Sequence, residues 1–406
     1  MTISSATSGV TPVVGFPTGP LIATLAIQSL ATMAAYSFPA AAPAIAHDLQ
    51  VPGTLVGFFV AAVYGVGIVS ALLSPGFIRR HGAVRASQVV LLATLAMLLT
   101  CAMGSIASVA IGAALLGLAY GATAPASTHL LVPRTPPGIM NFVMGIRQIG
   151  VPLGGVLAGL VMAPLTVRLG WRTALLCQTV PVLILLLLMQ IPRARWDSDR
   201  DTTHAIFRAG LLAPFALLRE SPAMRRLALT SFAYTSLQLC FTTFMTVHLT
   251  SKAGFDLVRA GQALALFQIS AVLTRPIWGW LADKVMAANK LLALQGVVSC
   301  TTAVLTGQFG ADWPPLAVLA ICAVAGATAS GFTGLAYAEW ARLGGARRTE
   351  ATGLGTAIMF AGVMLIPPAF SVTVTLLGDY GVAYAAVGGL AAISGLLLVG
   401  GGRKSD

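Results

Sequence analysis

The sequence predicts an all-α membrane protein with twelve transmembrane helices. Of its 406 residues, 57% are hydrophobic and only 9% are charged, and the mean hydropathy is +0.87. Runs such as 86–102 and 173–191 contain no charged residue, and each is close to the ~20 residues that cross ~30 Å of hydrocarbon. A backbone in lipid must satisfy its own hydrogen bonds, so we expect these runs to be helices. The short alternating segments of a transmembrane β-barrel are absent from the sequence.

Each expected span is an apolar run bounded by charged residues or by Gly and Pro. The spans are 20–46, 55–78, 86–104, 109–132, 140–166, 173–191, 226–250, 257–281, 291–310, 315–338, 351–376 and 382–400. One long polar insertion, which contains RARWDSDRD, divides them into six and six. We therefore expect an N-terminal tail (1–19), a first half (20–191), a central loop (192–225), a second half (226–400) and a C-terminal tail (401–406).

The distribution of Lys and Arg predicts the orientation. If the N-terminus is cytoplasmic, most basic residues fall in cytoplasmic loops, and the opposite side holds only Arg168, Arg172, Lys252 and Arg259. This is the positive-inside bias of an inner (cytoplasmic) membrane protein with both termini in the cytoplasm. The remaining two basic residues, Arg147 and Arg275, lie inside spans.

Several function classes are disfavoured by composition. The net charge of +12 is spread over short loops, so no basic domain for a nucleic acid is expected. The five cysteines lie in separate apolar spans, which suggests neither a metal site nor disulfides. The sequence has no phosphate-binding loop of an ATPase and no nucleophile with an oriented base. We expect no enzyme activity and no cofactor.

A loop motif gives a family resemblance. Gly279–Lys284 reads GWLADK between the eighth and ninth spans and resembles the G-x-L-A-D-R/K motif of the major facilitator superfamily. The resemblance implies two six-helix halves around a central cavity that opens alternately to each side. It also implies that Gly279 and Asp283 belong to a conformational latch, with Asp283 meeting helix-end donors and Arg or Lys partners. The first-half copy, SPGFIRRHGAVR, has Arg79 or Arg80 where the motif has Asp.

The two arginines within spans are the main candidates for a substrate site. An ionised side chain at mid-membrane costs at least ~2.5–3.5 kcal/mol on insertion scales, and arginine keeps its proton. No Asp or Glu lies near the centre of a span, so a bound anion is the best explanation for Arg147 and Arg275. A guanidinium matches the two oxygens of a carboxylate. Arg275-Pro276 also resembles the eighth-helix arginine of monocarboxylate and oxalate transporters in this superfamily. The alternative is that both arginines bond backbone carbonyls or amides and stabilise packing.

Other polar residues are candidate contacts or gating elements. Gln148 could bind substrate or brace the eighth span. Tyr234, Gln238 and Thr242 form an i, i+4, i+8 stripe, and Tyr36, Tyr64 and Tyr120 lie in the first, second and fourth spans. For each of them, bonding between helices is an equally good interpretation. Pro152 should bend its helix, and Gly154 should allow close packing, so both are candidate gating residues.

We therefore expect a monomeric secondary active transporter in the lipid bilayer. It would carry a small organic anion, a carboxylate in the leading hypothesis, coupled to protons or to an exchanged anion. A multidrug efflux antiporter is the first alternative, although it predicts a membrane acid that this sequence lacks. A non-transporting membrane sensor on the same fold is the second.

Overall fold

The computed structural model describes residues 15–50, 56–206, 213–255 and 257–400, and within them the regular elements are all helical. The expected tails at 1–14 and 401–406 lie outside the described residues. The first half contains α1 (Thr18–Ala40), α2 (Ala42–Leu49), α3 (Val56–His81), α4 (Ala83–Ala102), α5 (Ile106–Tyr120), α6 (Thr123–Leu131), α7 (Met140–Gln148), α8 (Gly150–Leu157), α9 (Ala163–Leu169) and α10 (Trp171–Leu188). The short helices α11 (Arg193–Trp196) and α12 (Ala216–Glu220) follow in the central segment. The second half contains α13 (Pro222–Ser251), α14 (Leu257–Lys284), α15 (Ala288–Gly307), α16 (Pro315–Ala329), α17 (Thr333–Gly344), α18 (Arg348–Leu377) and α19 (Tyr380–Gly400).

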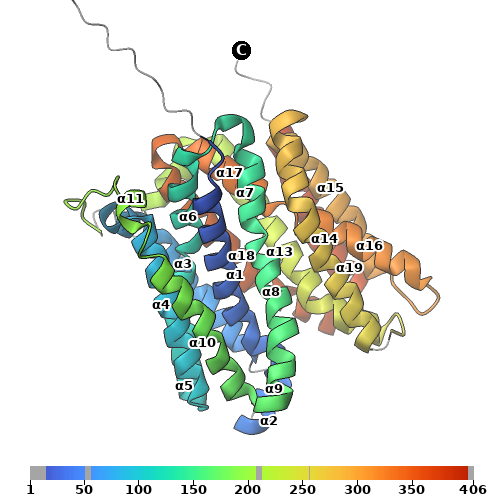
Figure 1. The fold of residues 1–406 in the computed structure, drawn as a ribbon. Helices are drawn as coiled ribbons and strands as arrows, with labels where there is room; N and C mark the ends of the chain where they lie inside the picture. Colours follow the sequence, from blue (N-terminus) through green and yellow to red (C-terminus); the bar gives the residue numbers. More distant parts are fainter. Residues whose placement is uncertain (1–14, 51–55, 207–212, 256, 401–406) are drawn as a thin grey trace, which may run out of the picture.

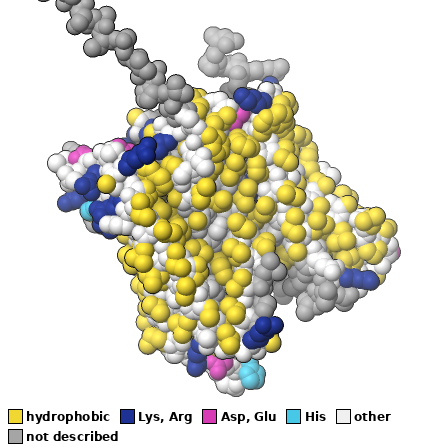
Figure 2. Space-filling model, in the orientation of Figure 1, with side chains coloured by type: hydrophobic (Ala, Val, Ile, Leu, Met, Phe, Trp, Pro, Cys, Tyr) yellow, Lys and Arg dark blue, Asp and Glu magenta, His cyan; other side chains and the backbone are white. Residues whose placement is uncertain are grey.

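The long helices run roughly side by side in one bundle (Figure 1). In the described part of the chain, nine helical segments are long and apolar enough to cross a membrane. The segments of α13 and α14 are not among the nine, although they have 30 and 28 residues. The expected count of twelve is thus not confirmed, whereas the all-helical membrane fold is. Figure 2 shows hydrophobic side chains over the middle of the visible face and Lys and Arg toward its ends.

Several spans that the sequence presents as continuous are broken near their centres. The span at 109–132 is divided into α5 and α6 at Gly121-Ala122, and the span at 315–338 into α16 and α17 at Ser330–Phe332. The span at 140–166 is divided into α7, α8, a π-helical turn at Ala158–Met162 and α9. Broken helices expose backbone groups that can bind polar atoms inside a membrane protein.

The central segment is shorter than expected, because α13 begins at Pro222 rather than at 226. Ser221 starts this helix by accepting a hydrogen bond from the Met224 amide through its hydroxyl (3.3 Å). Pro222 occupies the first helical position, where the missing N–H is not needed. The apolar run therefore begins later than the helix that carries it.

The helices form two main hydrophobic cores. One is built almost entirely from the first half and includes Phe38, Phe59 and Met97. The other is built mainly from the second half and includes Phe241, Phe267, Phe332 and Trp340. Helices α3 and α18 pack together, as do α7 and α14, so these two pairs join the halves. The polar site lies between the cores.

Candidate functional site

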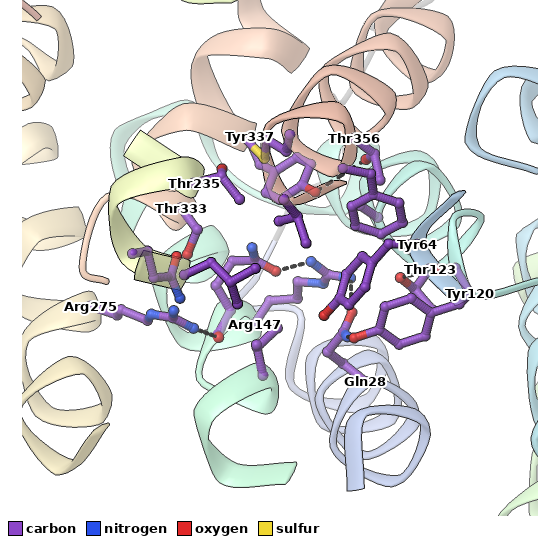
Figure 3. Close-up of a pocket in the computed structure, with 18 of the residues that line it drawn as sticks. Gln28, Tyr64, Tyr120, Thr123, Arg147, Thr235, Arg275, Thr333, Tyr337 and Thr356 are labelled. Carbon is purple, nitrogen blue, oxygen red and sulfur yellow. Dashed lines mark hydrogen bonds between the residues drawn. The ribbon is translucent and has the colours of Figure 1, made fainter. Parts of the chain in front are cut away.

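A cavity of about 90 Å³ lies at the junction of the two halves (Figure 3). Both halves contribute its walls. Its lining residues are Gln28, Tyr36, Tyr64, Tyr120, Thr123, Ala124, Arg147, Gln148 and Val151 from the first half, and Thr235, Gln238, Leu239, Arg275, Thr333, Tyr337, Thr356, Met359, Phe360 and Val363 from the second.

Arg147 points into this cavity from the last turn of α7 (Figure 3). It is 1% exposed. One terminal nitrogen donates to the side-chain oxygen of Gln148, and the other donates to the side-chain oxygen of Gln28 on α1 at 2.9 Å. Its Nε is buried without a hydrogen-bond partner, and its guanidinium lies 5.8 Å from the ring centroid of Tyr337. Neutral amides and one aromatic ring therefore surround a full positive charge.

Arg275 is held by backbone carbonyls. Its Nε and one terminal nitrogen donate to the carbonyl oxygen of Ser330 at 3.0 and 2.9 Å, in the break between α16 and α17. The second terminal nitrogen donates to the Gln148 carbonyl. Pro152 explains why that carbonyl is available, because proline has no N–H to bond the residue four positions earlier. The partial negative charge at the C-terminal end of α16 also favours the guanidinium.

The site carries two guanidinium groups and no acidic residue among the described residues that line it. Both arginines are 1% exposed. The bonds expected of packing braces are present, most completely at Arg275. These hydrogen bonds come from neutral groups, so they do not neutralise the two positive charges. The Nε of Arg147 has no hydrogen-bond acceptor among the described residues. The cavity is consequently electropositive.

Most of the sequence-predicted contacts come together here. Arg147, Arg275, Gln148, Tyr36, Tyr64, Tyr120 and Gln238 all line the cavity. Gln238 also donates to the Ser330 hydroxyl at 3.0 Å, which links α13 to the carbonyl that holds Arg275. The Tyr120 hydroxyl lies 3.0 Å from the Thr32 hydroxyl and 3.4 Å from the Gln28 amide nitrogen.

Tyr234 is a correction, because it does not line the cavity. Its hydroxyl donates to the Leu292 carbonyl on α15 at 2.5 Å, and its ring packs on Phe332 at 5.2 Å between centroids. The i, i+4 spacing placed Tyr234 and Gln238 on one helix face. Because Gly296 and Gly395 have no side chain, they leave room for the Tyr234 hydroxyl, and the residue reaches instead into the core of the second half.

Several lining residues were missed by sequence reasoning. Tyr337 on α17, Thr356 on α18 and Thr235 on α13 face the cavity (Figure 3). Phe360 on α18 also lines it. Phe360 meets Tyr64 edge-on at 4.8 Å and stacks on Tyr120 at 5.9 Å, both between ring centroids, so it closes one wall across the two halves. Tyr337 was detectable, because it is the only tyrosine in the tenth expected span.

Asp283 lies in the last turn of α14 and meets the start of α7. Its carboxylate accepts hydrogen bonds from the Asn141 and Phe142 amides at 3.2 and 2.9 Å. Gly279 makes this approach possible, because a Cβ there would collide with the Asn141 backbone. Gly154 likewise allows α8 to pack closely on α1, because a Cβ at this position would collide with the backbone of Ser29. Asp283 thus meets helix-end donors, but among the described residues its hydrogen-bond partners are Asn141 and Phe142 rather than an Arg or Lys.

The corresponding loop of the first half, SPGFIRRHGAVR, also contacts the other half, but it contributes a basic residue where the second-half loop contributes Asp283. Arg79, at the end of α3, lies 3.4 Å from the Glu350 carboxylate in the first turn of α18. Glu350 is also paired with Arg347 at 2.9 Å. In addition, His129 on α6 lies 3.0 Å from the Thr349 hydroxyl. These contacts and Asp283 all lie at the same end of the bundle as α11. We call this end of the bundle the basic end.

Comparisons with known proteins agree with this architecture. A sequence profile of the Major Facilitator Superfamily matches residues 24–341. The chain belongs to the major facilitator superfamily. Family and fold indicate a multi-pass membrane transporter rather than an enzyme.

Two solved structures have a similar fold. The human organic anion transporter MFSD10 (TETRAN) superposes with a TM-score of 0.74 at 17% identity, over 95% of this chain and 100% of that one. The E. coli fucose:proton symporter FucP superposes with a TM-score of 0.73 at 12% identity, over 94% and 98%. At these identities the similarity concerns the fold alone.

A curated relative is similar over a short stretch. The probable nitrate/nitrite transporter NarK2 of Mycobacterium tuberculosis is 32% identical over 116 residues. The match covers 23% of this chain and 29% of that relative's length.

Proposed function

We propose that this major facilitator protein is a secondary transporter of small anions, with carboxylates as the leading substrate class. The observation that carries the proposal is the pair of buried guanidiniums, Arg147 and Arg275, in a cavity whose described lining has no acidic residue. An uncompensated charge at this depth is costly. A bound anion removes that cost and satisfies the free Nε of Arg147.

The cavity favours a small substrate. Its volume of about 90 Å³ is well below the roughly 300–1,000 Å³ of pockets that bury drug-sized ligands. Multidrug efflux is therefore the weaker alternative. The aromatic walls of Tyr64, Tyr120 and Phe360 suit a short apolar or planar group attached to the anionic head.

Nitrate is a second candidate substrate. The specific observation in its favour is the 116-residue similarity to a probable nitrate/nitrite transporter. Nitrate and carboxylate are both planar and present oxygens that the same guanidinium fork can bind. The two ions differ in one respect. A carboxylate carries an organic substituent that the aromatic wall could contact, whereas nitrate carries none.

We further propose that the halves 20–191 and 226–400 rock around this site, with the basic end in the cytoplasm. The positive-inside bias supports that orientation. The latches at Asp283–Asn141 and Arg79–Glu350 both hold the basic end together, so this conformation is closed on that side. Because the described cavity lining has no acid to carry a proton, we favour anion exchange or a proton that travels with the substrate.

Thermal stabilisation of the purified protein tests the proposal. Short carboxylates, nitrate, sulfonates, sugars and cationic drugs would be compared, because a ligand that binds the folded state stabilises it by mass action. We expect carboxylates or nitrate to raise the melting temperature of the wild type. Arg147→Ala should abolish the shift.

Arg168→Ala is the matched control, because Arg168 is an exposed arginine on α9, outside the cavity, and the shift should persist in it. Stabilisation by cations or sugars alone would reject the anion proposal. An anion shift that survives in Arg147→Ala would remove the cavity from the binding site. Binding without uptake or exchange in proteoliposomes would favour the sensor alternative.

A further inference from the structure

A second basic hollow lies outside the central site, where α10 leaves the apolar zone. It has a volume of about 440 Å³ and is lined by Gln190, Arg193, Ala194, Asp197, Ser198 and Arg200. We call it the α11 hollow. Figure 2 shows Lys and Arg side chains gathered in this region, beside the position that α11 occupies in Figure 1.

The two arginines of the α11 hollow have unused donors. In the described part of the chain, the guanidinium groups of Arg193 and Arg200 make no hydrogen bond or ion pair, unlike those of Arg134 and Arg172. An unpaired arginine at a surface is common, but here two of them face one hollow whose described lining contains a single carboxylate, that of Asp197, so positive charge is in excess.

The acids near the hollow are already engaged. Asp197 is 3% exposed, and its oxygens accept hydrogen bonds from the Val84 and Arg85 amides at 2.8 and 3.1 Å, at the start of α4. Asp199 pairs with His129 at 3.1 Å. Neither carboxylate forms an ion pair with Arg193 or Arg200 in the described chain, and the charge of Arg193 acts on Asp197 only at longer range.

A strip of apolar side chains runs along α10 and ends at the α11 hollow. The helix presents exposed hydrophobic residues toward the surface as it approaches the hollow. They are Val180 (58% exposed), Leu183 (47%), Ile184 (53%), Leu187 (64%) and Leu188 (52%), and Ile191 (79%) follows in the turn after the helix. An apolar strip that ends at a pair of free guanidiniums has the pattern of a phospholipid, with an acyl chain below and an anionic phosphate above.

We infer that the α11 hollow binds the headgroup of one anionic phospholipid from the leaflet at the basic end. Arg193 and Arg200 bind the phosphodiester oxygens, and an acyl chain lies along α10. The bound lipid fixes the segment that carries Asp197 and Asp199. Through Asp199 and His129 that segment reaches Thr349 of the second half. This inference does not depend on the substrate of the central cavity.

The test measures lipid retention by the full-length protein. The protein would be reconstituted in nanodiscs of phosphatidylcholine with phosphatidylglycerol, extracted in detergent at about 0.5 M salt to screen diffuse attraction, and analysed by native mass spectrometry. We expect the wild type to retain one phosphatidylglycerol in preference to phosphatidylcholine. Arg193→Gln and Arg200→Gln should each lower that retention about fivefold or more, and Arg193→Lys should keep part of it.

Arg195→Gln is the matched control, because Arg195 belongs to the same short helix, is exposed and does not line the hollow. It should retain the lipid as the wild type does. Equal loss in all three Gln variants would show diffuse attraction and overturn the site. Inorganic phosphate is the second arm: if it alone stabilised the lipid-free protein as much as phosphatidylglycerol does, the ligand would be a soluble phosphate and the lipid assignment would fail.

Discussion

Asp283 of α14 accepts two hydrogen bonds from Asn141 of α7, one from the backbone amide at 3.2 Å and one from the side-chain amide at 2.8 Å. The Phe142 amide adds a third at 2.9 Å. These backbone N–H groups lie in the first turn of α7, where a helix has no internal acceptors. A carboxylate from one half therefore caps a helix of the other, and its negative charge suits the positive end of the helix dipole.

Asp283→Asn should weaken this cap and shift the protein away from the conformation closed at the basic end. The loss of a helix cap is worth about 1 kcal/mol, which corresponds to about a fivefold change in the balance between conformations. We expect the maximal transport rate in proteoliposomes to fall several-fold, while anion affinity by thermal shift changes little. Asp312→Asn, at an exposed loop residue, is the control. An unchanged transport rate in Asp283→Asn would dismiss the latch.

Replacing each buried arginine by lysine should separate substrate contact from packing. Arg275 holds the Ser330 and Gln148 carbonyls together, and an ammonium group cannot reproduce that planar fork. Arg275→Lys should therefore lower both the melting temperature and transport. Arg147 is bonded only to side-chain amides, so Arg147→Lys should lower anion affinity about tenfold, the scale of one charge-assisted bond, with a smaller loss of stability.

Stability and anion affinity, measured in both Arg147→Lys and Arg275→Lys, distinguish the arginine that binds substrate from the one that stabilises packing. Melting temperatures and anion dissociation constants would be compared in the same detergent. If Arg147→Lys bound anions normally but melted far below Arg275→Lys, the roles assigned to the two arginines would have to be exchanged.

The central segment should make stability depend on pH through Asp197. Burial raises the pKa of this carboxyl above its ordinary value, although the Val84 and Arg85 amides act in the opposite direction. Between the two pKa values the folded protein binds the proton more tightly than the unfolded chain does. The contribution of Asp197 to stability is therefore full below the ordinary Asp pKa and is lost as pH rises through the raised one.

Asp197→Asn removes this titration. We expect the melting temperature of the wild type, relative to that of Asp197→Asn, to increase as pH falls from 7 toward about 4. Taking the difference cancels the other carboxyls, which titrate in both proteins. A difference that stays constant or decreases over this range would show that burial does not dominate at Asp197.

Much of the architecture could be predicted from the sequence because membrane helices are specified locally. Apolar length predicts a span, and the lack of a nearby acid singles out Arg147 and Arg275. The link between them could not be predicted in the same way. It requires the Gln148 carbonyl, freed by Pro152, to meet a side chain 127 residues away.

The role of Asp197 as an acceptor for the amides at the start of α4 could not be predicted from the sequence either. RARWDSDRD is typical of a solvated charged loop, and the amides that Asp197 binds are 112 and 113 residues earlier. Such a contact depends on how the central segment folds back against α4. Local pattern therefore identified this segment, but not its structural role.

Tyr234→Phe should test a predicted contact that the structure moves out of the cavity. The substitution removes the bond from the Tyr234 hydroxyl to the Leu292 carbonyl, at a residue that is 2% exposed. We expect a loss of about 1 kcal/mol in stability and no change in anion affinity, because the hydroxyl faces α15. Tyr120→Phe is the matched comparison: Tyr120 lines the cavity and contacts Gln28, which holds Arg147. It should weaken anion binding. If Tyr234→Phe instead weakened binding as much as Tyr120→Phe, the tyrosine stripe of α13 would return to the substrate path.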